Sequence, residues 1–200
     1  VESSETDVTL EALAVVDGGL VSLTLRADGT GAKSCEGRPL EVAGTEDARL
    51  VDLASPVSRA VVDVSGRELV VTPLDGLRAG GAARFSCDGA RLEHVVSVPE
   101  PGGETLLVAL VSGPAYLVVA RVAPEGGIGL SPGAVTAVKL DGEPMRADRG
   151  PSHDLAVIGR RAFVSTRAGL VAFDLSAAGD ALERVTLPSG LRGPLAVIAR

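Results

Sequence analysis

Two cysteines are the first residues whose type and setting can do chemistry. They lie in matching frames, Lys-Ser-Cys-Glu-Gly at 33–37 and Phe-Ser-Cys-Asp-Gly at 85–89. Such a pair can form a disulfide, share a metal ion, act as a redox couple, or fill one structural position twice. The choice depends on how the surrounding elements place Cys35 and Cys87.

A second candidate is the pair His153 and Asp154, in the stretch GPSHDL that leads into an apolar strand. A histidine beside a carboxylate can bind a metal or orient a general base, and Arg149 lies nearby in the sequence. No serine or cysteine motif accompanies the pair, and the only other histidine is His94, in LEHVVSV. The alternative role for His153 is loop packing or a hydrogen bond between neighbouring sheets.

The glycine-rich segment APEGGIGLSPG, at 123–133, resembles a phosphate-binding loop only in composition. Such a loop needs a following helix whose N-terminus faces the anion, and here a strand pattern follows. We therefore expect a long loop in which Glu125, Gly126 and Gly127 contact a partner or take no part in binding.

Carboxylates for Ca²⁺ are offered by EPGGE, at 100–104, and by Asp148. They lack the regular acid spacing of a calcium-binding loop. A solvated turn is the expected structure, and the sequence predicts no metal and no cofactor.

Composition narrows the classes of function. The formal net charge of −7 argues against nucleic-acid binding, which depends on clustered Lys and Arg. No apolar run reaches the roughly 18 to 20 residues of a membrane span. Hydrophobic residues make up 46% of the chain and aromatic residues 2%, so the core must consist of Val, Leu and Ala, which suit strands.

A repeat organises the chain. Four stretches align without gaps as an apolar strand, a short turn and a second apolar strand: 13–23, 61–71, 108–118 and 155–165. The closing stretch LAVIAR, at 195–200, begins a fifth copy, and the steps are 48, 47, 47 and 40 residues. The predicted units run near 11–59, 60–106, 107–153 and 154–193, with a partial unit at 194–200.

Each unit continues with two further strands. The fourth unit supplies GLVAFDL and LERVTL, the second AARFSC and LEHVVSV, and the third AVTAVKL and a weaker PMRAD. Four short strands per 40–48 residues, separated by Gly, Pro and Asp turns, are typical of β-propeller blades. We predict an all-β domain over 8–200 after a polar leader at 1–7, with about four four-stranded blades and the first strand of a fifth.

The fourth unit also resembles a known family. Its stretch RRAFVSTRAGLVAFDLSAAGDALERVTLP is similar to the blades of bacterial propellers of the LVIVD and YVTN types, and the similarity is best over 155–188. Those propellers include binding scaffolds, secreted proteins and a few enzymes. The resemblance therefore implies the fold, and an extracytoplasmic location, more than it implies an activity.

The repeat gives the cysteines a structural interpretation. It places Cys35 and Cys87 in the position that Leu140 and Leu175 occupy in later units, so both are expected to be buried core thiols. Neighbouring sheets pack about 10 Å apart, whereas a disulfide needs Cα atoms roughly 4.4 to 6.8 Å apart. A disulfide stays open as an alternative because residues 45–60 do not fit the repeat.

The function predicted from the sequence is a non-enzymatic protein-interaction scaffold. Partners would contact loops at 99–105, 122–134, 146–154 and 187–194, with Asp148, Arg149 and His153 as binding candidates beside the residues of the glycine-rich segment. The unclosed count of blades predicts completion by further chain, a partner fragment or a second copy. The alternative is a propeller-fold hydrolase or lyase that acts through His153, Asp154 and Arg149.

Overall fold

The computed structural model describes residues 8–16, 19–27, 33–42, 44–54, 59–140, 154–166, 169–176, 182–185 and 187. These residues form strands and turns and contain no helix, which confirms the all-β class. The leader at 1–7 and the partial unit at 194–200 lie outside the described residues. No described helix is long and apolar enough to cross a membrane.

The strands form four antiparallel sheets, which we name A to D in chain order. Sheet A contains β1 (Val8–Val16), β2 (Gly19–Ala27) and β3 (Lys33–Pro39). Sheet B contains β4 (Arg49–Asp52), β5 (Arg59–Ser65), β6 (Glu68–Asp75), the short β7 (Arg78–Ala79) and β8 (Ala83–Ser86). Sheet C contains β9 (Arg91–Pro99), β10 (Thr105–Ser112), β11 (Tyr116–Glu125) and β12 (Gly129–Lys139). Sheet D contains β13 (Asp154–Ile158), β14 (Arg161–Thr166), β15 (Gly169–Asp174) and β16 (Glu183–Val185).

The four hairpins predicted from the repeat are confirmed. They are β1–β2, β5–β6, β10–β11 and β13–β14, each an antiparallel pair of neighbouring strands. The turn of β5–β6 has two residues with positive φ, Gly66 at 60° and Arg67 at 66°. A two-residue turn of this kind matches the right-handed twist of the strands that it joins.

The sheets do not coincide with the sequence units. The strand LEHVVSV, expected as the fourth strand of the second unit, is part of β9 and pairs with β10 of the next sheet. Likewise β4, which lies in the first unit, pairs with β5. Sheets B and C are therefore shifted by one strand, whereas sheet D follows the predicted order from β13 to β16. Alternation of apolar residues identifies a strand but not its partner, which explains the difference.

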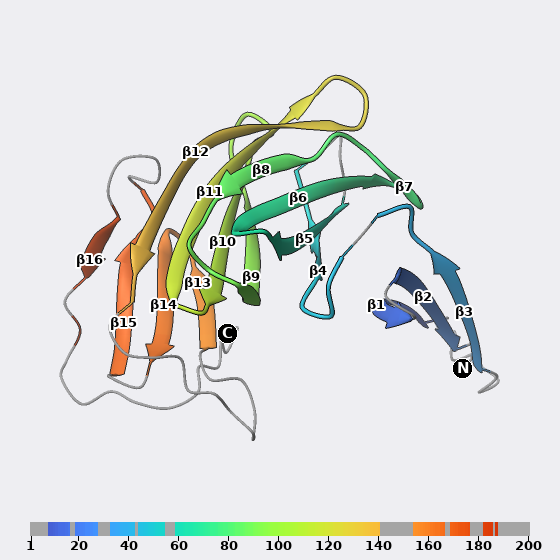
Figure 1. Cartoon of the computed structure of the whole chain (residues 1–200), viewed down its shortest axis with the longest axis horizontal. Coiled ribbons are helices and arrows are strands. Elements are labelled where there is room, and N and C mark those ends of the chain that lie inside the picture. Colours follow the sequence, from blue (N-terminus) through green and yellow to red (C-terminus); the bar gives the residue numbers. More distant parts are fainter. Residues whose placement is uncertain are drawn as a thin grey trace, which may run out of the picture.

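The sheets stand in a row, A, B, C and D, as Figure 1 shows from right to left. One apolar core fills the space between sheets B and C and a second fills the space between C and D. A smaller cluster, built on Leu20, Val61 and Leu74, joins sheet A to sheet B. Sheet C is therefore the only one of the four with both faces in a large described core.

Burial explains two different strand patterns. All eight residues of β10, TLLVALVS, are buried, as expected for a strand covered on both faces. In β5 the residues facing sheet C are all apolar, whereas the opposite face carries Val61, Asp63 and Ser65. This mixed face of sheet B is where the structure departs from a uniformly apolar stack.

The segment 123–133 is not the expected long loop. Strand β11 extends to Glu125, a short turn follows, and β12 begins at Gly129, so the segment is the end of a long hairpin. Figure 1 shows this hairpin reaching beyond the other strands of sheet C. The turn glycines Gly126 and Gly127 both have positive φ, 34° and 64°, a conformation for which glycine has no steric cost.

Candidate functional site

Most residues of the predicted His-Asp site lie outside the described residues. These are Asp148, Arg149 and His153. Asp154 is the first residue of β13, where its backbone pairs with Ser165 of β14. The structure therefore neither brings this group together nor separates it.

The other predicted binding residues occupy the tip of the β11–β12 hairpin. Glu125, Gly126 and Gly127 are all exposed, and a Cβ added to either glycine would meet no atom within 4 Å. Behind the tip, the backbone N–H of Leu130 donates to the carbonyl of Gly81, at 3.0 Å. The hairpin is thus fastened to sheet B while its tip faces outward.

Of the two cysteines, only Cys87 lies at the position that the repeat predicted for both. The backbone N–H groups of Cys87, Leu140 and Leu175 each donate to a carbonyl in the preceding hairpin turn, and all three side chains are buried. Cys35 instead lies within β3, opposite Leu25, and is exposed. The prediction of a core thiol is therefore wrong for Cys35, because β3 runs past it to Pro39 before the chain reaches the equivalent position.

Both cysteines are free thiols with different surroundings. Burial raises the pKa of the Cys87 thiol, because the apolar interior disfavours the thiolate. Neither cysteine belongs to a metal-binding group of three or more His, Cys, Asp or Glu residues within the described ranges.

The stretch at 100–104 is a turn with Pro101 and Gly102 exposed, as predicted, but its two carboxylates are not free. The Glu100 side chain is 7% exposed and pairs with Arg121, whose Nη2 lies 3.2 Å from Glu100 Oε2, and with Arg160. Glu104 also pairs with Arg121, at 3.4 Å. Because Arg121 belongs to sheet C and Arg160 to the β13–β14 turn of sheet D, these ion pairs join the two sheets instead of offering carboxylates to a cation.

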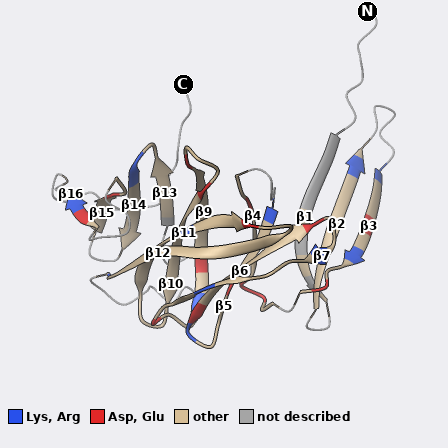
Figure 2. Cartoon of the chain, turned by 90° about the horizontal axis from the view of Figure 1, so that it is seen from above, with Lys and Arg blue, Asp and Glu red and all other residues tan. Residues whose placement is uncertain are grey.

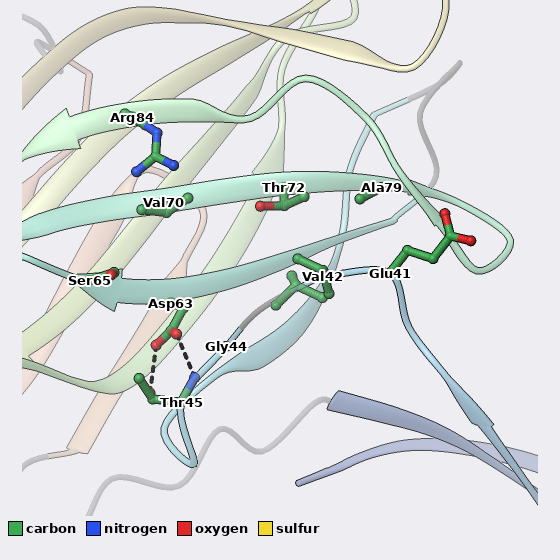
Figure 3. Close-up of a pocket in the computed structure, with 11 residues that line it drawn as sticks. Glu41, Val42, Gly44, Thr45, Asp63, Ser65, Val70, Thr72, Ala79 and Arg84 are labelled. Atoms are coloured by element: carbon green, nitrogen blue, oxygen red, sulfur yellow. Dashed lines mark hydrogen bonds between the residues drawn. The ribbon is translucent and has the colours of Figure 1, made fainter. Parts of the chain in front are cut away.

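A polar groove lies where the linker from sheet A crosses sheet B, and it is the candidate functional site (Figure 3). It encloses about 450 Å³. Its floor is the mixed face of sheet B, and one wall is the chain that leads from β3 to β4. Its polar lining residues are Glu41, Thr45, Asp63, Ser65, Thr72 and Arg84.

Asp63 fastens the wall of the groove to its floor. The residue is 6% exposed, and its carboxylate accepts hydrogen bonds from the Thr45 N–H at 2.7 Å, the Thr45 hydroxyl at 2.8 Å and the Val64 N–H at 2.8 Å. Its Oδ2 accepts only one of these three bonds and keeps capacity for another donor. A buried carboxylate needs such donors to offset its lost hydration.

The same linker is held a second time, two residues further on. Arg91 of β9 makes a bidentate ion pair with Asp47, with both N–O distances at 3.0 Å. The hydrogen bonds that Arg91 donates to the Asp47 carboxylate raise the pKa of Arg91. The wall is therefore attached to both sheet B and sheet C, and the groove has a defined shape.

Two hydroxyls in the groove have no hydrogen-bond partner among the described residues. Thr72 is 9% exposed, so it is nine-tenths buried, and Ser65 lies at an exposed position at the end of β5. Arg84 differs, because its Nη1 lies 3.1 Å from Glu68 Oε2 in an exposed ion pair. The groove thus offers free hydroxyls and a buried carboxylate, while its cation is already paired.

This arrangement is suited to hydrogen-bonded binding of a polar group. The residues that line the groove include no histidine and no cysteine. Sequence reasoning missed the groove. The available signal was Asp63, a charged residue in the middle of the apolar run VVDV, where a strand buried on both faces would carry none.

Comparison with models of known protein families gives no match, and comparison with curated proteins gives none either.

Proposed function

We propose that the chain is a non-enzymatic protein-interaction scaffold of β-propeller type, and that it forms part of a larger propeller or assembly. The observation that carries this proposal is the apolar outer face of sheet A at one end of the row of sheets. In a propeller, each sheet packs face to face with the next until the ring closes. A sheet at the end of an incomplete ring keeps one packing face uncovered.

The outer face of sheet A is apolar and accessible. The strand registers place Ala14 opposite Val21, Ala12 opposite Leu23 and Leu25 opposite Cys35 on one face. Val16 is 52% exposed and Leu25 40% exposed. The face toward sheet B carries Leu20, which is buried, and then Ser22, Thr24 and Arg26. A terminal sheet that ended the molecule would have the opposite arrangement, with polar residues outside.

The outer face of sheet D is also apolar, but it is only partly exposed. Ala156 pairs with Phe163, and Phe163 with Ala172, on the face that points away from sheet C. On the same face Ile158 is 54% exposed, and Phe163 and Leu170 are half-buried. Ala156 and Ala172 on this face are buried, at 9% and 0% exposed, so it is open mainly at Ile158. The open apolar face of sheet A favours a further β-sheet as the occupant, because such a sheet would continue the packing of sheets A to D.

The surface of the molecule favours protein partners over nucleic acid. Lys and Arg are interspersed with Asp and Glu over the described sheets and do not form one basic face (Figure 2). The tip at Glu125–Gly127 is exposed and available to a partner. These features agree with a scaffold, whose loops contact partners while its sheets provide rigidity.

The experiment is sedimentation velocity of the purified chain over a hundredfold range of concentration. We expect concentration-dependent association, which Leu25→Glu and Ile158→Glu each weaken by placing a charge on an end face. Val135→Glu is the matched control, because Val135 is 39% exposed on β12 and lies on neither end face. A chain that stays monomeric and unfolds in one cooperative step, with all three variants alike, would contradict the proposal.

A further inference from the structure

The groove between the linker and sheet B contains a buried carboxylate, Asp63, that has no cationic partner among the described residues. Asp63 is nearly fully buried, yet all three of its donors are neutral groups, and its carboxylate forms no ion pair with any described residue. The other carboxylate of the lining, Glu41, is exposed. The one lining cation, Arg84, is already paired with Glu68. The lining therefore has an excess of negative charge on its floor.

The free hydroxyl of Thr72 lies beside that charge. On sheet B, Asp63 is opposite Val70 and Val61 is opposite Thr72, so Asp63 and Thr72 are diagonal neighbours on one face. Diagonal neighbours of this kind have Cα atoms about 7–8 Å apart, within reach of one small group between their side chains. Figure 3 shows the Asp63 carboxylate turned toward Thr45, with Thr72 on the neighbouring strand β6. Thr72 is a nine-tenths buried residue whose side chain lines the groove and makes no hydrogen bond to a described residue, which is a second, independent indication of a ligand.

We propose that the groove binds a primary ammonium group. An ammonium has three donors and no acceptor, and the groove offers two acceptors on diagonal neighbours, the remaining lone pair of Asp63 Oδ2 and the Thr72 hydroxyl, while Ser65, opposite Glu68, lies too far along β5 to reach the same group. Val42, Val61 and Val70 also line the groove and provide an apolar path for an aliphatic stem. The ligand is therefore an alkylammonium, which either a lysine side chain of a partner protein or a free diamine can present.

An anion is a poorer fit. Its binding would need Arg84 to leave Glu68 and would bring negative charge toward Asp63, and like charges at short range disfavour each other. A neutral polar ligand would satisfy the hydroxyls but leave the buried carboxylate without a counter-ion. Only a cation with hydrogen-bond donors would both neutralise the Asp63 carboxylate and bond the Thr72 hydroxyl. This inference does not depend on the proposed scaffold function.

The test is a titration of the full chain, followed by amide chemical shifts in ¹H–¹⁵N NMR spectra. The two probes are 1,5-diaminopentane and N-acetyl-lysine amide, and 1-pentanol is the neutral control. We expect saturable shifts at the amides of 61–65 and 70–72 with the amines and none with the alcohol. The probe with the tighter binding identifies the source, a free diamine or a lysine side chain.

Three variants sharpen the test. Thr72→Val keeps the side-chain volume, removes one acceptor and should weaken binding about 3- to 10-fold, the value of one hydrogen bond. Asp63→Asn removes the charge and should weaken binding more than tenfold. Asp52→Asn removes the same charge from a side chain that is 89% exposed on β4 and should change nothing.

The outcomes are decisive even if one variant fails to fold. If Asp63→Asn loses its dispersed spectrum, the result for Thr72→Val decides, because that variant leaves the Asp63 hydrogen bonds intact. No saturable shift below about 10 mM amine, equal shifts with pentanol, or equal weakening by Thr72→Val and Asp52→Asn would overturn the proposal.

Discussion

The two faces of sheet B are formed by the same strands but contact their neighbours in different ways. Toward sheet C, its Val62, Val64, Leu69 and Phe85 are at most 4% exposed and belong to one continuous apolar core. Toward sheet A, Val61, Leu74 and the partly buried Leu50 join an apolar cluster, and other residues of the face line a polar groove. One face holds its neighbour by burial and the other by hydrogen bonds.

The difference comes from the alternation of side chains along a strand, as β5 shows. In β5, the residues Ala60, Val62 and Val64 point one way, and Val61, Asp63 and Ser65 point the other. Burial of a Val or Leu side chain contributes about 1.5–3 kcal/mol. A hydrogen bond contributes only about 1 kcal/mol net, but leaving its partner unpaired in the interior costs more. The apolar interface is therefore stronger, and the polar one depends more on each single residue.

The largest expected effect comes from Leu107 in β10, which is fully buried in the core between sheets B and C. Leu107→Ala leaves a cavity in a packed interior and should lower the free energy of unfolding by about 2–5 kcal/mol. Leu25→Ala, on the exposed outer face of sheet A, should change it by less than about 0.5 kcal/mol in dilute solution. Urea titration of both variants measures the difference, and equal losses would mean that sheet C is not the centre of the structure.

The next effect tests the polar side of the comparison. Asp63→Ala leaves the N–H groups of Thr45 and Val64 and the Thr45 hydroxyl without their acceptor, and should cost about 2–3 kcal/mol. Asp52→Ala removes an exposed carboxylate, 3.8 Å from Arg59, and should cost less than about 1 kcal/mol. Urea titration again measures both variants. A loss for Asp63→Ala no larger than for Asp52→Ala would show that the linker holds sheet B by other contacts.

Sequence patterns predicted the local structure well. All four hairpins and the third strands AARFSC, AVTAVKL and GLVAFDL are strands of the structure with the expected neighbours in sequence. The reason is that a strand and its hairpin partner are specified by residues close together, through alternation and turn glycines. The ring itself, and the completion of the ring by other sheets, remain predictions.

Long-range pairing and the groove were not predictable in the same way. The strand β9 is separated from β8 and from β10 by short turns of similar character, and its apolar residues suit either neighbour. The groove depends on the path of residues 40–48, a stretch without repeat or alternation, and on one carboxylate, Asp63. The exposure of Cys35 has the same origin, since the repeat could not fix the register of β3.

A smaller effect concerns the contact between the β11–β12 hairpin and the edge of sheet B. A Cβ at Gly80 would lie 1.8 Å from the carbonyl oxygen of Ile128, whereas a Cβ at Gly81 would lie 3.7 Å from Gly129 Cα. Gly80→Ala should therefore displace the hairpin and cost about 1–3 kcal/mol. Gly81→Ala is the control and should be neutral or stabilise by up to about 1 kcal/mol, through the unfolded chain.

Hydrogen exchange locates the effect of Gly80→Ala. Protection of the Leu130 amide, which donates to Gly81, should fall in this variant and persist in Gly81→Ala. Unchanged protection in both variants would show that the hairpin is not fastened to sheet B.

The smallest effect uses the two cysteines as reporters of the two kinds of surface. Cys35 lies on the open face of sheet A and should react with a maleimide at the rate of an exposed thiol. Cys87 is 4% exposed at the end of β8, in the core that sheet B shares with sheet C, and should react only when that core opens. Mass spectrometry of the singly labelled chain at pH 7 checks this order. Equal labelling of both thiols would place Cys87 outside the core.

Raising the pH should also weaken the fold through the Cys87 thiol. Burial raises the pKa of Cys87, so the folded chain keeps the thiol proton at pH values where the unfolded chain has already lost it. The resulting stability is fully present below the ordinary cysteine pKa of about 8.5 and is lost as the pH rises through the raised value. Unfolding by urea at pH 7 and pH 10, compared between the natural chain and Cys87→Val, isolates this contribution from other titrating groups. The loss between the two pH values should be smaller in Cys87→Val, and an equal loss in both proteins would show that the thiol proton is not linked to folding.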